Sequence, residues 1–164
     1  KVFEICKYGA IIIANDLPNF IKTKSENSLF NLLEAAMIAG HCISLSRTGL
    51  IHTLNVAVAK YTELSHGYLN GLIMPHVLNE NLSLYNGRLA DFFNEDNDKL
   101  ASSKITKFIR KFIPESKKIH IPSEEYSNIF ARLKQDLGLS DVNGQEVSQD
   151  TFINLIQNIS YEKR

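Results

Sequence analysis

The chain of 164 residues has no excess of charge of either sign, because 18 lysines and arginines balance 18 aspartates and glutamates. A protein that gathers nucleic acid phosphates needs a basic field. The balance therefore argues against nucleic acid as a partner. Hydrophobic residues make up 44% of the sequence and charged residues 22%, as in an ordinary globular protein. The length suits one domain with a sizeable core.

Cysteine is scarce, with only Cys6 and Cys42 in the sequence. Both lie within apolar helical patterns, where a free cysteine packs as a small hydrophobic residue. We therefore expect buried free thiols, with a disulfide as the alternative. Free thiols favour a reducing compartment, so the expected location is the cytoplasm.

Membrane and secretion signals are also lacking. The apolar run 35–46 is too short and too polar to span a bilayer, and no signal peptide can be read at the start. We expect no membrane partner. The length suits a single helical domain over residues 1–164, and since the chain begins at Lys1 rather than Met, we expect it to be a fragment of a longer protein.

The sequence contains no convincing strand of period two, and its apolar periodicity is helical almost throughout. It predicts an all-α bundle of about eight helices. The expected segments are 3–16, 19–23, 27–46, 50–59, 65–79, 82–94, 102–113, 123–137 and 148–159. Pro18 should open the second segment, and Pro75 should kink or end the fifth. The stretch 114–122 should be a loop with some extended character, and Gly138 should be the C′ residue that follows the helix 123–137.

In the segment 27–46, we expect one apolar stripe to be buried. Its members are Leu29, Leu32, Leu33, Ala36, Met37 and Gly40.

Five histidines are the candidate ligands. His41 lies in an apolar helix and is expected to be structural. His120 has no partner in the sequence, and His76 is a helix-face residue with no assigned role. His52 and His66 are fourteen positions apart. On one straight helix they would be separated by roughly 21 Å, at about 1.5 Å per residue.

Ligands of one metal must each approach it to about 2.0–2.2 Å, so a shared metal requires the chain to reverse between His52 and His66. The polar stretch 60–65 (KYTELS) is the available break, with Ser65 as an N-cap. Gly67, next to His66, should let other backbone approach closely. The spacing permits a metal site on two helices, but two unrelated core histidines remain the alternative.

The segments EAAMIAGHCISLSRTGLIH and SHGYLNGLIMPHVLNEN carry further information, as does NDLPNFIK before them. Together they resemble the C-terminal helical domain of the iron-containing (group III) alcohol dehydrogenases. The resemblance covers about residues 8–95. The matching positions are Ala36, Ala39, Gly40, Gly49, Leu50, His52, His66, Gly67, Met74, Pro75, Val77 and Asn81.

The resemblance implies that His52 and His66 bind a catalytic divalent metal, with iron expected and zinc as the alternative. An Asp-x-x-x-His pair would supply the other ligands from a segment before Lys1. The metal would act as a Lewis acid on a small alcohol or aldehyde, and NAD(P) would exchange the hydride. The implied partner is an N-terminal nucleotide-binding domain, and a homodimer is left open.

Three positions depart from the family pattern. Val56 stands where a proton-transfer histidine is usual, Ser65 replaces a proline, and Ala59 replaces a glycine. We therefore name no catalytic and no cofactor-binding residue in this chain, and expect no dehydrogenase activity from it alone. The principal hypothesis is an alcohol dehydrogenase domain. The alternative is a degenerate, non-catalytic domain that serves as an interaction module.

Overall fold

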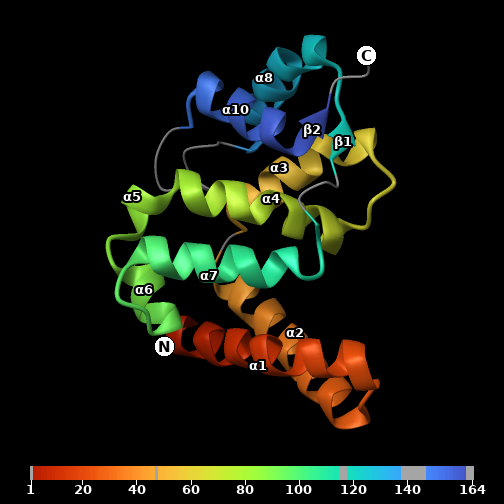
Figure 1. Ribbon diagram of the computed structural model, residues 1–164. Coiled ribbons are helices and arrows are strands. Elements are labelled where there is room, and N and C mark those ends of the chain that lie inside the picture. The colour runs from red at the N-terminus through yellow and green to blue at the C-terminus, as the bar shows by residue number, and fades with distance from the viewer. Residues whose placement is uncertain (1, 47, 115–117, 138–146, 162–164) are drawn as a thin grey trace. The chain divides into compact units, whose positions relative to one another are not determined.

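A computed structural model describes residues 2–46, 48–114, 118–137 and 147–161 (Figure 1). These residues form nine α-helices, two short 3-10 helices and one pair of two-residue strands, which confirms the all-α prediction. The chain divides into two compact units, Lys1–Arg47 and Thr48–Arg164, which are described separately.

The first unit consists of two long helices, α1 (Val2–Thr23) and α2 (Glu26–Leu45), packed against each other (Figure 1). The side chain of Ser25 caps α2 by accepting a hydrogen bond from the backbone N–H of Ser28. The Ser28 hydroxyl, itself buried, accepts a hydrogen bond of 2.7 Å from Nδ2 of Asn19. This bond ties the end of α1 to the start of α2.

The predicted break before Pro18 is wrong, since α1 runs through this residue to Thr23. Proline removes one N–H donor from a helix interior. The helix therefore continues with one hydrogen bond fewer around Pro18.

The predicted buried stripe of α2 is also wrong. Ser28, Ala35 and Cys42 are buried instead, at intervals of seven residues. Their small side chains allow close packing with α1. Met37, by contrast, is 77% exposed.

Helix α2 is long and apolar enough to cross a membrane by length and composition, although only 17% of that window is buried. The expectation from the shorter run 35–46 did not anticipate this length. One helix of this kind is weak evidence for a membrane span.

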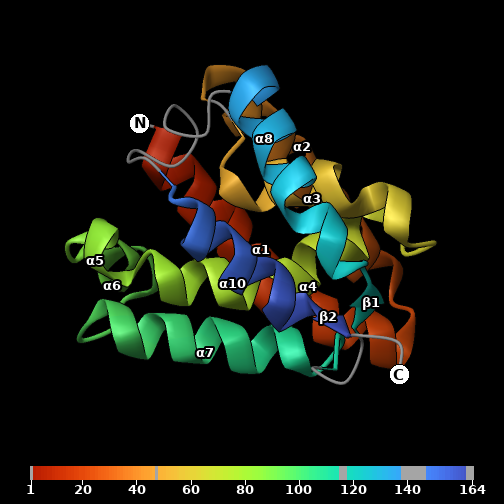
Figure 2. The same cartoon turned by 90° about the horizontal axis from the view of Figure 1, so that it is seen from above.

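The second unit is built around α4 (His66–Glu80), which contacts α3 (Leu50–Val58), α7 (Asp98–Arg110) and α10 (Gln149–Ile159). Figure 2 shows α4 and α7 side by side, with α10 crossing in front of α4. The helix α8 (Tyr126–Leu137) packs on α3 and α10. The largest buried side chains of the core are Leu54, Val58, Leu69, Leu72, Ile73, Ile121, Ile129, Phe152, Ile156 and Ile159.

Two proline and turn positions shape this unit. Helix α4 continues through Pro75 to Glu80, so this proline does not end it. The predicted single helix 82–94 is two helices, α5 (Leu82–Tyr85) and α6 (Arg88–Phe93). The left-handed backbone of Asn86 (φ 50°) and Gly87 (φ 85°) separates them.

Helix α7 begins at Asp98, four residues before the predicted start. Its N-cap is Asn97, whose Oδ1 accepts a hydrogen bond from the N–H of Leu100. The Asp98 carboxylate accepts hydrogen bonds from the N–H groups of Gly87 (2.7 Å) and Ala90 (2.8 Å). One side chain thus fixes the start of α7 to the start of α6.

The loop 114–122 contains the predicted extended segment. Its strand β1 (Ile119–His120) pairs in parallel with β2 (Ser160–Tyr161), so that Ile119 faces Ser160 in register. The 3-10 helix η2 (Ser123–Glu125) then leads into α8. The predicted role of Gly138 lies outside the described residues.

Candidate metal centre

The chain reverses direction between His52 and His66, as the sequence predicts. His52 lies in the first turn of α3, and His66 is the first residue of α4. The 3-10 helix η1 (Ala59–Tyr61) and the irregular residues 62–65 make the turn. Ser65 is the N-cap residue of α4 as predicted, but its side chain makes no capping hydrogen bond.

The turn brings the two imidazoles together. Their ring centroids are 5.0 Å apart and the ring planes cross at 62°. Metal–nitrogen bonds of about 2.0–2.1 Å at tetrahedral or octahedral angles place two imidazole centroids about 5 Å apart. His52 is half-buried and His66 is exposed, so the pair lies at the surface. A centroid separation of this size suits two ligands of one divalent metal, and it equally suits edge-to-face contact of two rings.

Asn55 fixes the relation between the two helices that carry this pair. It is only 1% exposed, and its Nδ2 donates hydrogen bonds of 2.8 Å to the backbone oxygen of His66 and to Oδ1 of Asn70. The Oδ1 atom of Asn55 is buried and has no hydrogen-bond partner among the described residues. Asn55 thus holds the first turn of α4 against α3.

Val56 lies four residues after His52, on the same side of α3, and is 53% exposed. Its side chain can neither donate nor accept a proton. The expected close approach of other backbone to Gly67 is not observed among the described residues. A Cβ at this position would meet no atom within 4 Å.

The other histidines lie elsewhere. His41, which was expected to be structural, is exposed on α2. His76 on α4 lies 3.3 Å from Nη2 of Arg110. His120 contacts Tyr161, with its Nδ1 at 3.2 Å from the backbone oxygen. Within the described ranges, no group of three or more His, Cys, Asp or Glu side chains could hold a metal.

Sequence reasoning missed Asn55 and Arg110. Asn55 could have been noticed as an isolated amide in the apolar pattern of residues 50–58. Arg110 carried no signal, because a basic residue in a last helical turn is common.

Comparison with known protein families shows which family the chain belongs to. The model of the C-terminal part of the Fe-containing alcohol dehydrogenase family matches residues 4–164. The chain belongs to the Fe-containing alcohol dehydrogenase family. The match extends well beyond residues 8–95, where the motifs are readable. A comparison with curated proteins found no matching sequence.

Proposed function

We propose that this Fe-containing alcohol dehydrogenase domain binds one divalent metal through His52 and His66. The distance of 5.0 Å between their ring centroids is the observation that carries the proposal. Iron is the expected metal, with zinc as the alternative. When bound, the metal supplies Lewis-acid chemistry at the oxygen of an alcohol or aldehyde.

The chain's own residues supply the positions of the two ligands. Asn55 restrains the backbone of His66, while the buried face of α3 restrains His52. A metal binds each imidazole through a ring nitrogen that carries no proton.

In this proposal the remaining ligands, NAD(P) and most of the substrate pocket belong to an N-terminal nucleotide-binding domain. The complete enzyme would interconvert a small alcohol and its aldehyde or ketone in the cytoplasm. The chain alone would bind metal weakly, because two imidazoles form an incomplete ligand set.

Metal titration of the chain tests the site. Co²⁺ or Zn²⁺ binding, measured by calorimetry, should fall at least about tenfold in His52→Ala and in His66→Ala. His41→Ala is the matched control, since it removes an exposed histidine from α2. Unchanged metal affinity in both site variants, or an equal loss in the control, would refute the ligand assignment.

The exposed Val56 beside His52 is the observation that favours the second candidate, a degenerate domain without catalysis. Turnover of simple alcohols with NAD(P) by the complete protein decides between them. Measurable turnover would rule out the non-catalytic domain, whereas metal binding without turnover would support it.

A further inference from the structure

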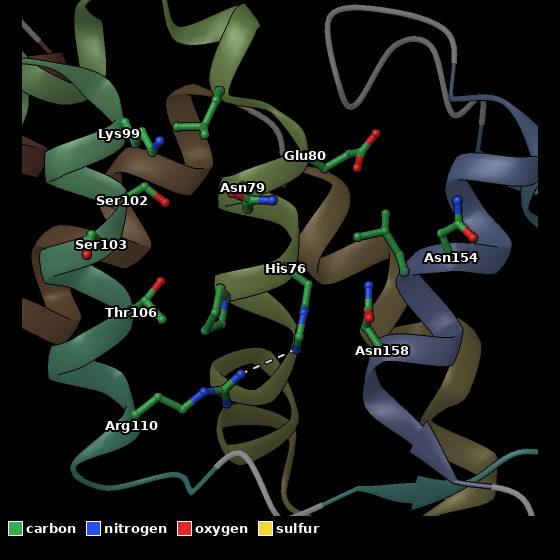
Figure 3. Close-up of a pocket in the computed structure, with 13 residues that line it drawn as sticks. His76, Asn79, Glu80, Lys99, Ser102, Ser103, Thr106, Arg110, Asn154 and Asn158 are labelled. Carbon is green, nitrogen blue, oxygen red and sulfur yellow. Dashed lines mark hydrogen bonds between the residues drawn. The ribbon is translucent and has the colours of Figure 1, made fainter.

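A second candidate site lies in a polar pocket of about 400 Å³ between α4, α7 and α10 (Figure 3). It is remote from the histidine pair. On α4 the pocket residue His76 lies ten positions after His66. At about 1.5 Å per residue, this separates the two sites by roughly 15 Å along the helix.

The wall from α7 is a continuous stripe of hydrogen-bond donors. The pocket-lining residues of this helix follow one another at steps of one, three and four, and every one of them can donate a hydrogen bond. They are Lys99, Ser102, Ser103, Thr106 and Arg110. In Figure 3 this stripe faces α4, and Asn154 and Asn158 of α10 lie on the other side.

Arg110 is the member of the stripe that has a buried hydrogen-bond donor without an acceptor in the part of the chain that the structure describes. Its Nη2 lies 3.3 Å from Nε2 of His76, and since arginine has no acceptor, the imidazole nitrogen must accept. Its Nη1 is buried and has no hydrogen-bond partner in the described parts of the chain. A buried guanidinium nitrogen without an acceptor is costly, and an oxyanion would provide that acceptor.

The charge of the pocket also favours an anion. Lys99 and Arg110 contribute two positive charges, and neither forms an ion pair within the described residues. Glu80 is the only carboxylate in the lining, and it lies at the end of the pocket away from Arg110 (Figure 3). The end occupied by Arg110, His76 and Thr106 is therefore cationic and rich in donors.

We propose that this pocket binds a small molecule through a phosphate or carboxylate group, with Arg110 as the anchor. In this proposal the guanidinium rotates from its contact with His76, so that Nη1, which is buried in the free chain, reaches one ligand oxygen. Thr106 and Asn158 lie beside the same end and donate to the remaining oxygens. This proposal does not depend on the metal site, because it uses none of its residues.

Titration of the chain with inorganic phosphate and with succinate tests the proposal and distinguishes the two headgroups. Binding is followed by the ¹H–¹⁵N shifts of the Arg110 side chain and of the α7 amides, at constant ionic strength. We expect saturable shifts on both walls of the pocket with at least one probe. The absence of saturable shifts with both probes would overturn the proposal.

Arg110→Gln should lower the affinity for the bound probe at least about tenfold, because it removes the charge-assisted hydrogen bonds. Lys107→Gln is the matched control. It removes one positive charge from the exposed side of the same helix, outside the pocket, and should change affinity less than twofold. An equal loss in both variants would mean general ionic attraction and would refute the site.

Arg110→Lys covers the case in which Arg110→Gln unfolds. It retains the charge but loses the planar fork, so affinity should still fall severalfold. Thr106→Val, which keeps the shape of the side chain, should weaken binding about threefold or more. Wild-type affinity in both variants would overturn the proposed geometry.

Discussion

Asn55 donates a hydrogen bond of 2.8 Å from its Nδ2 to the backbone oxygen of His66, across the turn that joins α3 to α4. The same nitrogen donates to Oδ1 of Asn70. One buried amide thus binds both the first turn of α4 and a side chain one turn further along. The relative placement of the two histidine rings depends on this link.

Asn55→Leu should destabilise the chain by about 1–3 kcal/mol. The change keeps similar volume but leaves the His66 carbonyl oxygen and Asn70 without their donor. Urea unfolding followed by circular dichroism measures the effect. Asn128→Leu, at an exposed position of α8, is the control and should change stability by less than about 0.5 kcal/mol. Equal effects would mean that the Asn55 bonds contribute nothing specific.

Val58→Ala should cost about 2 kcal/mol, whereas Val56→Ala should be nearly neutral. Val58 is 0% exposed and Val56 is 53% exposed, and the two lie two positions apart on α3. Val58→Ala removes apolar surface that is buried on folding, and it leaves a cavity in the core. Thermal and urea unfolding of both variants provide the comparison. A cost at Val56 that matched the cost at Val58 would contradict the assigned buried face of α3.

The reversal between the histidines could be predicted because the chain offers one polar break between two apolar helical runs. The Asn86–Gly87 break is also a readable turn signal, although the prediction joined 82–94 into one helix. That apolar pattern continues across the break, and periodicity alone cannot detect a change of backbone hand.

The packing of α2 and the role of Asn55 could not be predicted in the same way. The apolar pattern of α2 predicts a buried face of large residues, but the residues buried on this helix include the small Ser28 and Ala35. Close helix approach depends on the partner's surface, which a single segment does not reveal. The Asn55 link likewise depends on the tertiary approach of α4.

Alkylation of Cys6 should require an unusually high pH. Burial, followed by a hydrogen bond and charge interaction with Cys42, raises the pKa of the Cys6 thiol from 9.0 to about 11. The pKa of Cys6 is higher in the folded chain than in the unfolded chain. The folded state therefore keeps its full stability below pH 9 and loses part of it as pH rises towards 11, because the buried thiol resists ionisation. Iodoacetamide rates across this range, resolved by peptide mass spectrometry, measure the pKa.

Cys42→Ala is the control for this titration. It removes the neighbouring thiol, so the pKa of Cys6 should move down towards its ordinary value while burial still holds it above 9.0. An alkylation midpoint near 9.0 in the wild-type chain would contradict both the burial of the Cys6 thiol and its contact with Cys42.

Val56→His should raise the affinity of the chain for Zn²⁺ at least about tenfold. Histidines at positions i and i+4 lie on one helical face, so the new imidazole would join His52 beside His66 as a third ligand. Competition with a chromophoric chelator measures the affinity. Val56→Ala should leave it unchanged, and His66→Ala in the Val56→His background should cancel the gain. If Val56→His bound zinc no better than Val56→Ala, the Val56 side of α3 would not face the His66 ring.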